Sequence, residues 1–279
     1  MENEKITLSI IIPCYNCAET ICECVESVVN EAIANNLSYE IIAVDDGSSD
    51  NTLLILNKLA FENKNIKVIS QSNSGPSVAR NVGLKLASGD FIALNDADDK
   101  WLPGKLKVQL EYLHQNPDID LLCAKYGNCR RTEIKQEITL KKEVFHNYFS
   151  PQTSIFRKKV LVCGNIYFSE NQKYSEDMKF IIDVMQHYKC MYIPILSTVP
   201  VISKCVFGES GLSSHIWKME KGEVKNIYHV FKINQISFFY MIIAIAWSLI
   251  KYFRRIIIFA LIRIKKIKYM KNNKKENVE

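Results

Sequence analysis

Polar and acidic residues gather at three places in the first hundred residues, each directly after an apolar segment. They are Pro13–Asn16, the pair Asp45 and Asp46, and the turn 95–99, whose sequence is NDADD. Carboxylates at one strand end repel each other unless a cation or a hydrogen-bond donor satisfies them. All-oxygen ligands suit Mg2+ or Mn2+, and a polyphosphate is the natural complement of such an ion. The residues therefore predict a site for a divalent ion and a phosphorylated ligand, although a solvated turn explains 45–50 equally well when it is taken alone.

The apolar pattern around these groups alternates between strand and helix. Continuous apolar runs are typical of strands buried on both faces, and apolar residues at every third or fourth position are typical of helices. This predicts strands at 8–12, 40–44, 66–69 and 91–94, and helices at 18–34, 53–59 and 76–89. Three strand–helix units followed by a fourth strand indicate a parallel α/β sheet. Ligands of such sheets bind beyond the carboxyl ends of the strands, where the three polar clusters lie.

The sequence lacks the phosphate-binding fingerprints of other α/β proteins. It contains neither G-x-x-x-x-G-K-[ST] nor G-x-G-x-x-G, and the turn 95–99 lacks the glycine and glutamate of an EF-hand. A metal and a side-chain cation must hold the phosphates instead. Arg80 is the candidate cation, because it lies in the first turns of the helix that begins at Pro76, where backbone N–H groups also point outward. Taken alone, Arg80 would be a surface arginine.

The cysteines predict a reducing compartment. Nine cysteines are an odd number for a disulfide framework, and the first nine residues lack the apolar segment of a secretory signal, so we expect a cytosolic body with free thiols. The cluster Cys14, Cys17, Cys22 and Cys24 could hold zinc. Its spacing matches no common zinc module, so small buried thiols are the favoured interpretation.

Five segments, in order, resemble the motifs of family 2 glycosyltransferases. They are SIIIPCYN (9–16), VDDGSSD (44–50), NSGPSVARNVG (73–83), NDADD (95–99) and SED (175–177). The resemblance covers about residues 6–215 and implies a GT-A fold, a Rossmann-like and mostly parallel sheet flanked by helices. It also implies an inverting, metal-dependent enzyme that uses a nucleotide sugar. One departure is Asn95, which stands where many relatives have a hydrophobic residue.

The resemblance implies a role for particular residues of this chain. The nucleotide sugar would be bound by Pro13, Tyr15, Asn16, Asp45, Asp46, Arg80 and Asp96. In this assignment Asp46 accepts from the uracil N–H of a UDP-sugar, and Asp98 binds Mg2+ or Mn2+ at the diphosphate. Asp177 matches the general base, and Glu176 beside it would order the acceptor side. Ser213 lies in a Gly- and Ser-rich stretch, 208–214, that would close over the donor or form a plain surface loop.

These assignments fit the chemistry of glycosyl transfer. A sugar hydroxyl is a poor nucleophile until a carboxylate takes its proton as it attacks the anomeric carbon, which is the role implied for Asp177. The leaving diphosphate gains negative charge, which a metal on Asp98 would stabilise. A single displacement then inverts the anomeric centre. Without the resemblance, Asp177 near a helix start would be a cap or a partner of the helix dipole.

The charge of the chain is divided between a body and a tail. Residues 232–279 hold 11 Lys and Arg against two acids, net +9, and the first 231 residues hold 25 against 28, net −3. The apolar segment 236–250 is roughly 22 Å long as a helix, too short for the ~30 Å hydrocarbon layer. We therefore expect an amphipathic helix that lies on a membrane surface through 236–275. Packing on the body or on a dimer partner is the alternative, and a nucleic-acid arm is disfavoured because the tail is too apolar.

Together these observations predict a GT-A domain over 1–215, with a nucleotide-binding half at 1–100 and an acceptor half at 101–215, and a basic membrane-associating helical tail at 216–279. The predicted reaction moves a hexose or N-acetylhexosamine from a UDP-sugar to a lipopolysaccharide, capsule or lipid-linked glycan. We expect the protein in the cytoplasm, peripheral on the inner face of the cell membrane. The alternatives are a sugar nucleotidyltransferase and an inactive scaffold of the same fold. A nucleotidyltransferase would need a Gly- and Lys-rich loop near the N-terminus. The intact set of Asp46, Asp98 and Asp177 disfavours an inactive scaffold.

Overall fold

The structure is a computed structural model that describes residues 7–127, 133–202 and 215–276. The chain divides into two compact units, Met1–Cys205 and Val206–Glu279, which we call the body and the tail and describe separately. The strands of the body are β1 (Leu8–Cys14), β2 (Tyr39–Asp45), β3 (Ile66–Ser70), β4 (Phe91–Leu94), β5 (Asp99–Trp101), β6 (Leu121–Tyr126), β7 (Gln136–Ile138), β8 (Ile155–Arg157) and β9 (Cys190–Pro200). Its helices are α1 (Ile21–Ala34), α2 (Thr52–Glu62), α3 (Pro76–Leu86), α4 (Lys105–Gln115), α5 (Leu140–His146), the 3-10 helix η1 (Pro151–Thr153), α6 (Lys159–Val162) and α7 (Glu176–Met185).

The body is built on one mixed sheet with the strand order β3-β2-β1-β4-β8-β6-β9-β5, and β7 pairs with β9. The first four strands are parallel, and the predicted strands and intervening helices of this half are confirmed. The second half begins at β8, which lies antiparallel between β4 and β6. The strands β5, β7 and β8 have only three residues each, and so they carry too few residues to show a strand period in the sequence.

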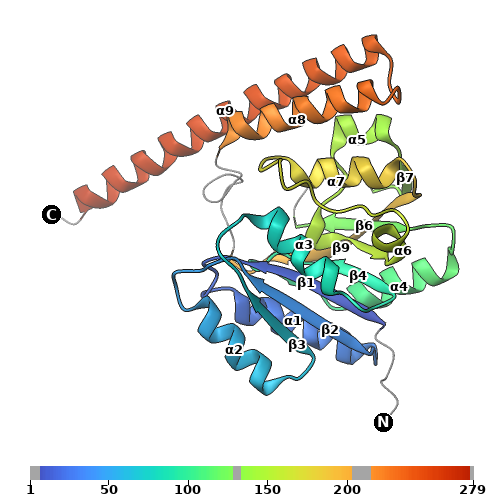
Figure 1. Cartoon of the computed structure of the whole chain (residues 1–279). Helices are drawn as coiled ribbons and strands as arrows, with labels where there is room; N and C mark the ends of the chain where they lie inside the picture. The colour runs from blue at the N-terminus through green and yellow to red at the C-terminus, as the bar shows by residue number, and fades with distance from the viewer. Residues whose placement is uncertain (1–6, 128–132, 203–214, 277–279) are drawn as a thin grey trace. The chain divides into compact units, whose positions relative to one another are not determined.

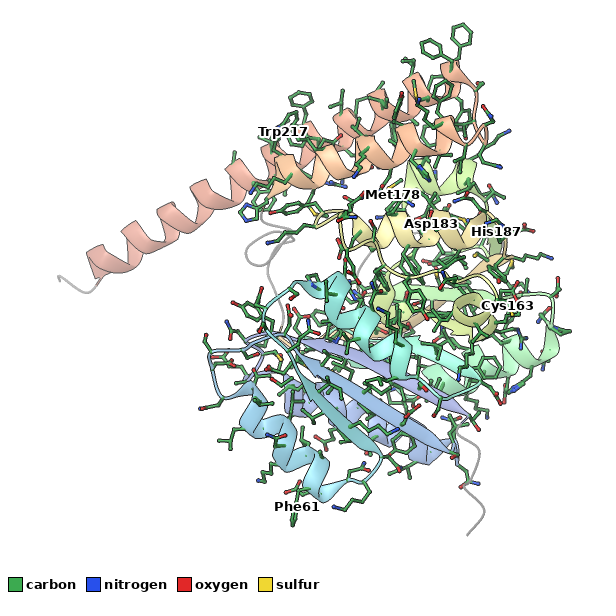
Figure 2. All side chains as sticks on the ribbon, viewed as in Figure 1. Phe61, Cys163, Met178, Asp183, His187 and Trp217 are labelled. Carbon is green, nitrogen blue, oxygen red and sulfur yellow. The ribbon has the colours of Figure 1, made fainter. Side chains whose placement is uncertain are left out.

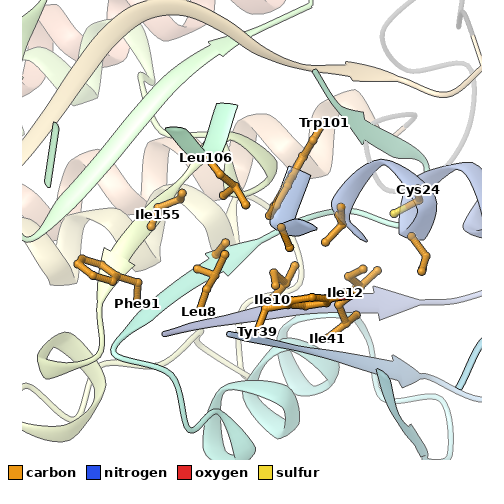
Figure 3. Packing of buried hydrophobic residues seen from close by; sticks show 14 of the residues in the cluster. Leu8, Ile10, Ile12, Cys24, Tyr39, Ile41, Phe91, Trp101, Leu106 and Ile155 are labelled. Carbon is orange, nitrogen blue, oxygen red and sulfur yellow. The ribbon is translucent and has the colours of Figure 1, made fainter. Parts of the chain in front are cut away.

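Helices cover both faces of this sheet (Figure 1). Successive strand residues point to opposite faces, so Ile10 and Ile12 of β1 pack with α1, α2 and α4, whereas Ile11 packs with α3 and α7. Figure 3 shows the first of these clusters, in which Trp101 and Leu106 close over the β1 and β2 side chains. Burial on both faces explains why the parallel strands are continuous apolar runs.

The predicted cysteine cluster does not form a common site in the described part of the chain. Cys14 and Cys24 are buried, Cys17 is half-buried and Cys22 is exposed. No group of three or more His, Cys, Asp or Glu side chains is arranged to hold a metal among the described residues. Each of the seven described cysteines is a free thiol.

The tail consists of two helices, α8 (Ile216–Lys232) and α9 (Phe238–Glu276). They are joined by a short turn at 233–237, in which Asn234 adopts a left-handed conformation with φ 58°. Within the described residues, neither these helices nor those of the body combine the length and apolarity that a membrane crossing requires.

Candidate active site

The three predicted polar clusters lie at one edge of the sheet. Cys14 of β1 is in register with Asp45 of β2, and the N–H of Asp46 donates to the carbonyl of Cys14 at 2.8 Å. The N–H of Asn95 donates to the carbonyl of Ile11 at 3.0 Å, which places the turn 95–99 beside β1. The parallel strands therefore bring the loops after β1, β2 and β4 together at their carboxyl ends, the edge at which open α/β sheets bind ligands.

Asp46 fastens the loop between β3 and α3 to the end of β2. Its Oδ1 accepts from the Gln71 side chain at 2.7 Å and from the Ser74 N–H at 2.8 Å, and its Oδ2 accepts from the Gly75 N–H at 2.8 Å. Each carboxylate oxygen has more than one acceptor position, so Oδ2 keeps capacity for a further donor such as a base N–H. Asp46 thus shapes the loop 71–75.

The same loop passes so close to Gly47 that a side chain would not fit there. Gly47 has φ +72°, and a Cβ atom would lie 2.8 Å from the backbone nitrogen of Asn73. Glycine is required for both reasons, since other residues rarely adopt this φ and the contact is with backbone. The VDDG motif therefore specifies a close approach of the loops 45–50 and 71–75.

The loop after β1 is locked to the same turn by Asn16. Asn16 has φ 48°, its N–H donates to Ser48 Oγ at 3.0 Å, and its Oδ1 accepts from the Ser49 N–H at 2.8 Å. Pro13 is half-buried, and the neighbouring Tyr15 is 54% exposed. Asn16 and Tyr15 are both exposed; Asn16 also fixes the loop after β1 to the turn 48–49, and the Tyr15 ring is accessible to a ligand.

Asp45 is placed differently from Asp46, although both were predicted to bind the nucleotide sugar. The Asp45 side chain is buried, and its Oδ2 accepts weakly from the Ser48 N–H and from Ser70 Oγ, both at 3.4 Å. Its Oδ1 is buried and has no hydrogen-bond partner among the described residues. Asp45 is the last residue of β2 and its side chain lies beside Ser70 of β3, whereas Asp46 follows the strand and its side chain accepts from the loop 71–75.

The acidic turn 95–99 distributes its side chains among several partners. Asn95 is fully buried and its Nδ2 donates to the carbonyl of Asp99 at 3.1 Å, so this departure from the family pattern closes the turn from inside. Asp99 is also buried and accepts from the Tyr126 hydroxyl at 2.7 Å. Burial, together with the charge of Asp99, raises the pKa of Tyr126, which keeps its hydroxyl protonated as the donor.

Arg80 joins this turn to helix α7. Its Nη2 donates to Asp96 Oδ1 at 2.8 Å and its Nη1 donates to Glu176 Oε1 at 3.2 Å. The guanidinium also lies over the Phe168 ring, 5.1 Å from the centroid. Burial opposes the charge on Arg80, but Asp96 and Glu176 raise its pKa above the ordinary value. Arg80 is therefore a buried, fully charged link between two acidic segments rather than a surface arginine.

The pair Glu176 and Asp177 forms the first turn of α7. Ser175 before it has φ 54°, a strained conformation for a residue with a side chain, and such strain is typical of functional sites. Burial, followed by the charge of Asp177, raises the pKa of Glu176 to about 7, against the opposing effect of Arg80. Burial also raises the pKa of the half-buried Asp177, and Asp96 adds to this. Both carboxyl groups therefore bind protons more strongly than ordinary acids.

The residues around Asp98 fit a metal ion that is bound by the protein and by the phosphates of its ligand together. Asp96 is paired with Arg80, Asp99 accepts from Tyr126, and the half-buried Asp98 is the residue of this turn to which the family resemblance gives the metal. Magnesium is usually bound by one or two carboxylates together with substrate phosphates, rather than by a cage of protein groups alone. A single carboxylate at a diphosphate site satisfies that requirement.

Three residues of the site were not predicted from the sequence: Gln71, which holds Asp46; Tyr126, which holds Asp99; and Phe168, which supports Arg80. Tyr126 is the last residue of β6, and the apolar run at 121–124 that begins this strand was the available signal. The predicted residue Ser213 and the stretch 208–214 lie outside the described residues.

Comparisons with known proteins agree with this geometry. The sequence profile described as "Glycosyl transferase family 2" matches residues 9–176. An uncharacterized glycosyltransferase of Haemophilus influenzae is 31% identical over 242 residues, covering 80% of this chain and 92% of that protein. The Escherichia coli UDP-Glc:alpha-D-GlcNAc-diphosphoundecaprenol beta-1,3-glucosyltransferase WfgD is 35% identical over 158 residues, 56% of each chain.

Solved structures share the fold. The Staphylococcus aureus TarS fragment 1–349 in complex with UDP is 25% identical and has a TM-score of 0.65, covering 89% of this chain and 72% of that chain. The mannosyltransferase PcManGT from Pyrobaculum calidifontis, in complex with GDP-Man and Mn2+, has a TM-score of 0.62 at 16% identity and shows the likeness of fold alone, over 82% of this chain and 65% of that chain. The chain is a GT-A glycosyltransferase that belongs to glycosyl transferase family 2.

Proposed function

We propose that the protein transfers a hexose or N-acetylhexosamine from a UDP-sugar to a hydroxyl group of a lipid-linked or cell-surface glycan, with inversion at the anomeric carbon. The observation that carries this proposal is the buried link Asp96–Arg80–Glu176. This link joins the acidic turn 95–99, where the donor is proposed to bind, to the carboxylate pair 176–177, which includes the proposed base. One ion-pair network therefore holds both the donor site and the base in place.

The donor half of the site fits a uridine nucleotide. Asp46 presents a carboxylate that can accept a base N–H, and the exposed Tyr15 ring lies on the neighbouring loop after β1. Two relatives support UDP as the nucleotide. WfgD is named for UDP-Glc, and TarS has been solved with UDP.

Asp177 is the proposed general base. Its raised pKa brings the carboxylate closer to neutral pH, where a base accepts a proton from a sugar hydroxyl more effectively. As the hydroxyl oxygen attacks the anomeric carbon, its proton passes to Asp177 and the bond to the diphosphate breaks. Glu176, held by Arg80, positions Asp177 by fixing the first turn of α7.

Asp98 is the proposed ligand of a divalent ion, Mg2+ or Mn2+, and the two phosphate groups of the donor would supply further oxygen ligands. The chemistry of such an ion is to stabilise the negative charge that develops on the leaving diphosphate. The Mn2+ in the PcManGT complex supports a divalent ion for folds of this class. Arg80 lies too deep and too fully paired to be the principal phosphate ligand, so we assign it the task of positioning Asp96 and Glu176.

The acceptor is proposed from the relatives. The name of WfgD gives its acceptor as a GlcNAc joined to diphosphoundecaprenol, which is a lipid-linked sugar. A lipid-linked or surface glycan is therefore the acceptor class that we propose for this chain.

The test is a panel of nucleotide sugars, assayed for release of the nucleoside diphosphate with and without Mn2+ or Mg2+. We expect turnover of one UDP-sugar, lost on chelation and reduced at least about a hundredfold in Asp177→Asn and Asp98→Asn. Asp183→Asn is the matched control, because Asp183 lies on the same helix (Figure 2) and pairs with Lys179. Turnover that survives both Asp177→Asn and Asp98→Asn would contradict the proposed mechanism.

A further inference from the structure

The two tail helices pack against each other through polar groups. Ser248 of α9 donates to Glu220 of α8 at 2.7 Å, and both side chains are buried. Lys251 pairs with Glu223, and Arg255 lies 3.8 Å from the same carboxylate. Two basic residues of the segment 236–275, Lys251 and Arg255, are therefore engaged within the tail itself.

The opposite face of α9 is apolar and exposed. Seven residues recur at intervals of three, four or seven along this face, and we call them the outer stripe: Phe239, Ile242, Ile243, Ala246, Ile250, Phe253 and Ile257. All seven are exposed, Phe239 to 78%, and Trp247 beside them is also exposed. At 1.5 Å per residue the stripe is about 27 Å long. An ordinary surface helix buries its apolar face, whereas α9 exposes this one.

The charge next to the outer stripe is cationic. Arg254 is exposed at the edge of the stripe. Helix α9 runs back along α8 and continues well past its first residue, Ile216, as far as Glu276 (Figure 1), and the sequence from Arg263 to Lys275 contains seven Lys and Arg and no acid. One helix thus joins a long apolar stripe to a strongly cationic segment.

We propose that the outer stripe of α9 inserts into the interfacial region of an anionic bilayer, and that the segment 263–275 is held by the lipid headgroups. Apolar side chains of a helix lying in the interface enter the boundary of the acyl region, and the exposed Trp247 suits the headgroup level. The cytoplasmic leaflet carries the negative surface charge that attracts a cationic segment. This places the protein peripherally on the inner face of the membrane, where a lipid-linked acceptor is presented.

A second copy of the chain is the competing occupant of the stripe. Two copies would bury their apolar faces against each other, but the cationic segments would then repel rather than contribute to binding. An anionic surface satisfies both features at once, because the stripe gains an apolar environment and the charges gain partners. The observations therefore favour a membrane over a dimer.

The test is flotation of the full chain with vesicles of phosphatidylcholine alone and with an equal part of phosphatidylglycerol. We expect binding to the anionic vesicles, weakened by high salt, and a loss of about tenfold or more in the partition coefficient of the variant F239Q/I243Q/I250Q/F253Q. Gln keeps the helix propensity, and circular dichroism checks that the helices remain. The matched control is L54Q/F61Q, because Leu54 and Phe61 are exposed apolar residues of α2, Phe61 to 79% (Figure 2).

Two results would overturn the proposal. One is equal binding of the wild type and the stripe variant to anionic vesicles, which would show that the stripe does not insert. The other is a wild-type dimer in light scattering that becomes a monomer in the stripe variant, with no vesicle binding by either, which would assign the stripe to self-association. The assay measures binding without turnover, so its outcome is independent of the proposed reaction.

Discussion

Arg80 Nη1 lies 3.2 Å from Glu176 Oε1, a contact between helices α3 and α7 that joins residues 96 positions apart in the sequence. Both side chains are buried, and Asp96 binds the other end of the same guanidinium. A charge in such a position is stable only while its partners remain. The link therefore contributes to folding and to the arrangement of the site at once.

Replacing Arg80 by Gln should lower the free energy of unfolding by about 3–5 kcal/mol, because the buried Glu176 and the half-buried Asp96 lose their counter-charge. Chemical denaturation measures this change, and Lys58→Gln on the exposed side of α2 is the control, expected to change stability by less than about 0.5 kcal/mol. The double variant R80Q/E176Q should recover part of the loss, since one uncompensated charge is gone. Strictly additive effects of the two changes would show that Arg80 and Glu176 do not act as a pair.

Replacing Asp46 by Ala should weaken UDP binding about tenfold to a hundredfold, because the carboxylate orders the loop 71–75 and is the proposed acceptor of the base N–H. Isothermal titration calorimetry with UDP measures the affinity. Asp118→Ala is the control, because Asp118 precedes β6 at the opposite edge of the sheet and pairs with Lys189. Unchanged UDP affinity in Asp46→Ala would exclude this residue from the nucleotide site.

The pH profile of kcat/KM should show an acid limb above the ordinary carboxyl range. The pKa of Glu176 is raised to about 7, so this group holds its proton at pH 5.5 and the Arg80 ion pair is weakened there; the pKa of Asp177 is also raised, so the base is lost at a higher pH than for an ordinary aspartate. Activity should rise as the pH increases toward 8. In Glu176→Gln the limb should move to lower pH, since one raised carboxyl is removed. A wild-type limb centred below pH 5 would contradict the assignment.

Lys105 predicts a separate dependence of stability on pH. It is buried at the start of α4, where its Nζ donates to the carbonyl of Gln152 at 3.0 Å and lies 4.7 Å from the Trp101 ring centroid. Burial lowers the pKa of Lys105 to about 7. Above pH 7 the folded protein releases a proton that the unfolded chain keeps up to about pH 10.4, so stability rises with pH across this window and falls as the pH is lowered through it.

The measurement is the free energy of unfolding of the wild type and of Lys105→Met at pH 7 and pH 9. Relative to that of the Met variant, the free energy of unfolding of the wild type should fall by about 2 kcal/mol from pH 9 to pH 7. The Met variant lacks the titrating group. Lys107→Met is the control, since Lys107 is exposed on the same helix. A difference between wild type and Lys105→Met that does not change with pH would exclude a depressed lysine pKa.

The parallel half of the fold was predictable because its signals are local. Four apolar runs and the helical spacing between them identify β1 to β4 and α1 to α3, and the topology of parallel strands then places Asp46 and Asp98 at one edge. The second half was not predictable in this way. Its strands β5, β7 and β8 are held by partners far away in the sequence, and three residues carry no clear period.

The roles of individual side chains depend on tertiary contacts, which the spacing of residues in the sequence does not predict. The sequence placed Arg80 at a helix start, but its two carboxylate partners come from the turn after β4 and from α7. Asp45 and Asp46 are adjacent and chemically identical, yet the Asp46 side chain accepts from the loop 71–75, whereas that of Asp45, the last residue of β2, accepts from Ser48 and Ser70. Asn95, a departure from the family pattern, was found to close the acidic turn from within.

The pairing of β5 with β9 has a consequence for the order in which the protein forms during synthesis. Asp99 pairs with Pro200 and Trp101 with Thr198, so the strand directly after the acidic turn waits for a partner made about a hundred residues later. At translation rates of about 5–20 residues per second, that interval lasts roughly 5–20 s. The nascent chain can therefore complete β1, β2 and β3 early, but the turn that carries Asp98 reaches its final form only when the last strand of the body has left the ribosome.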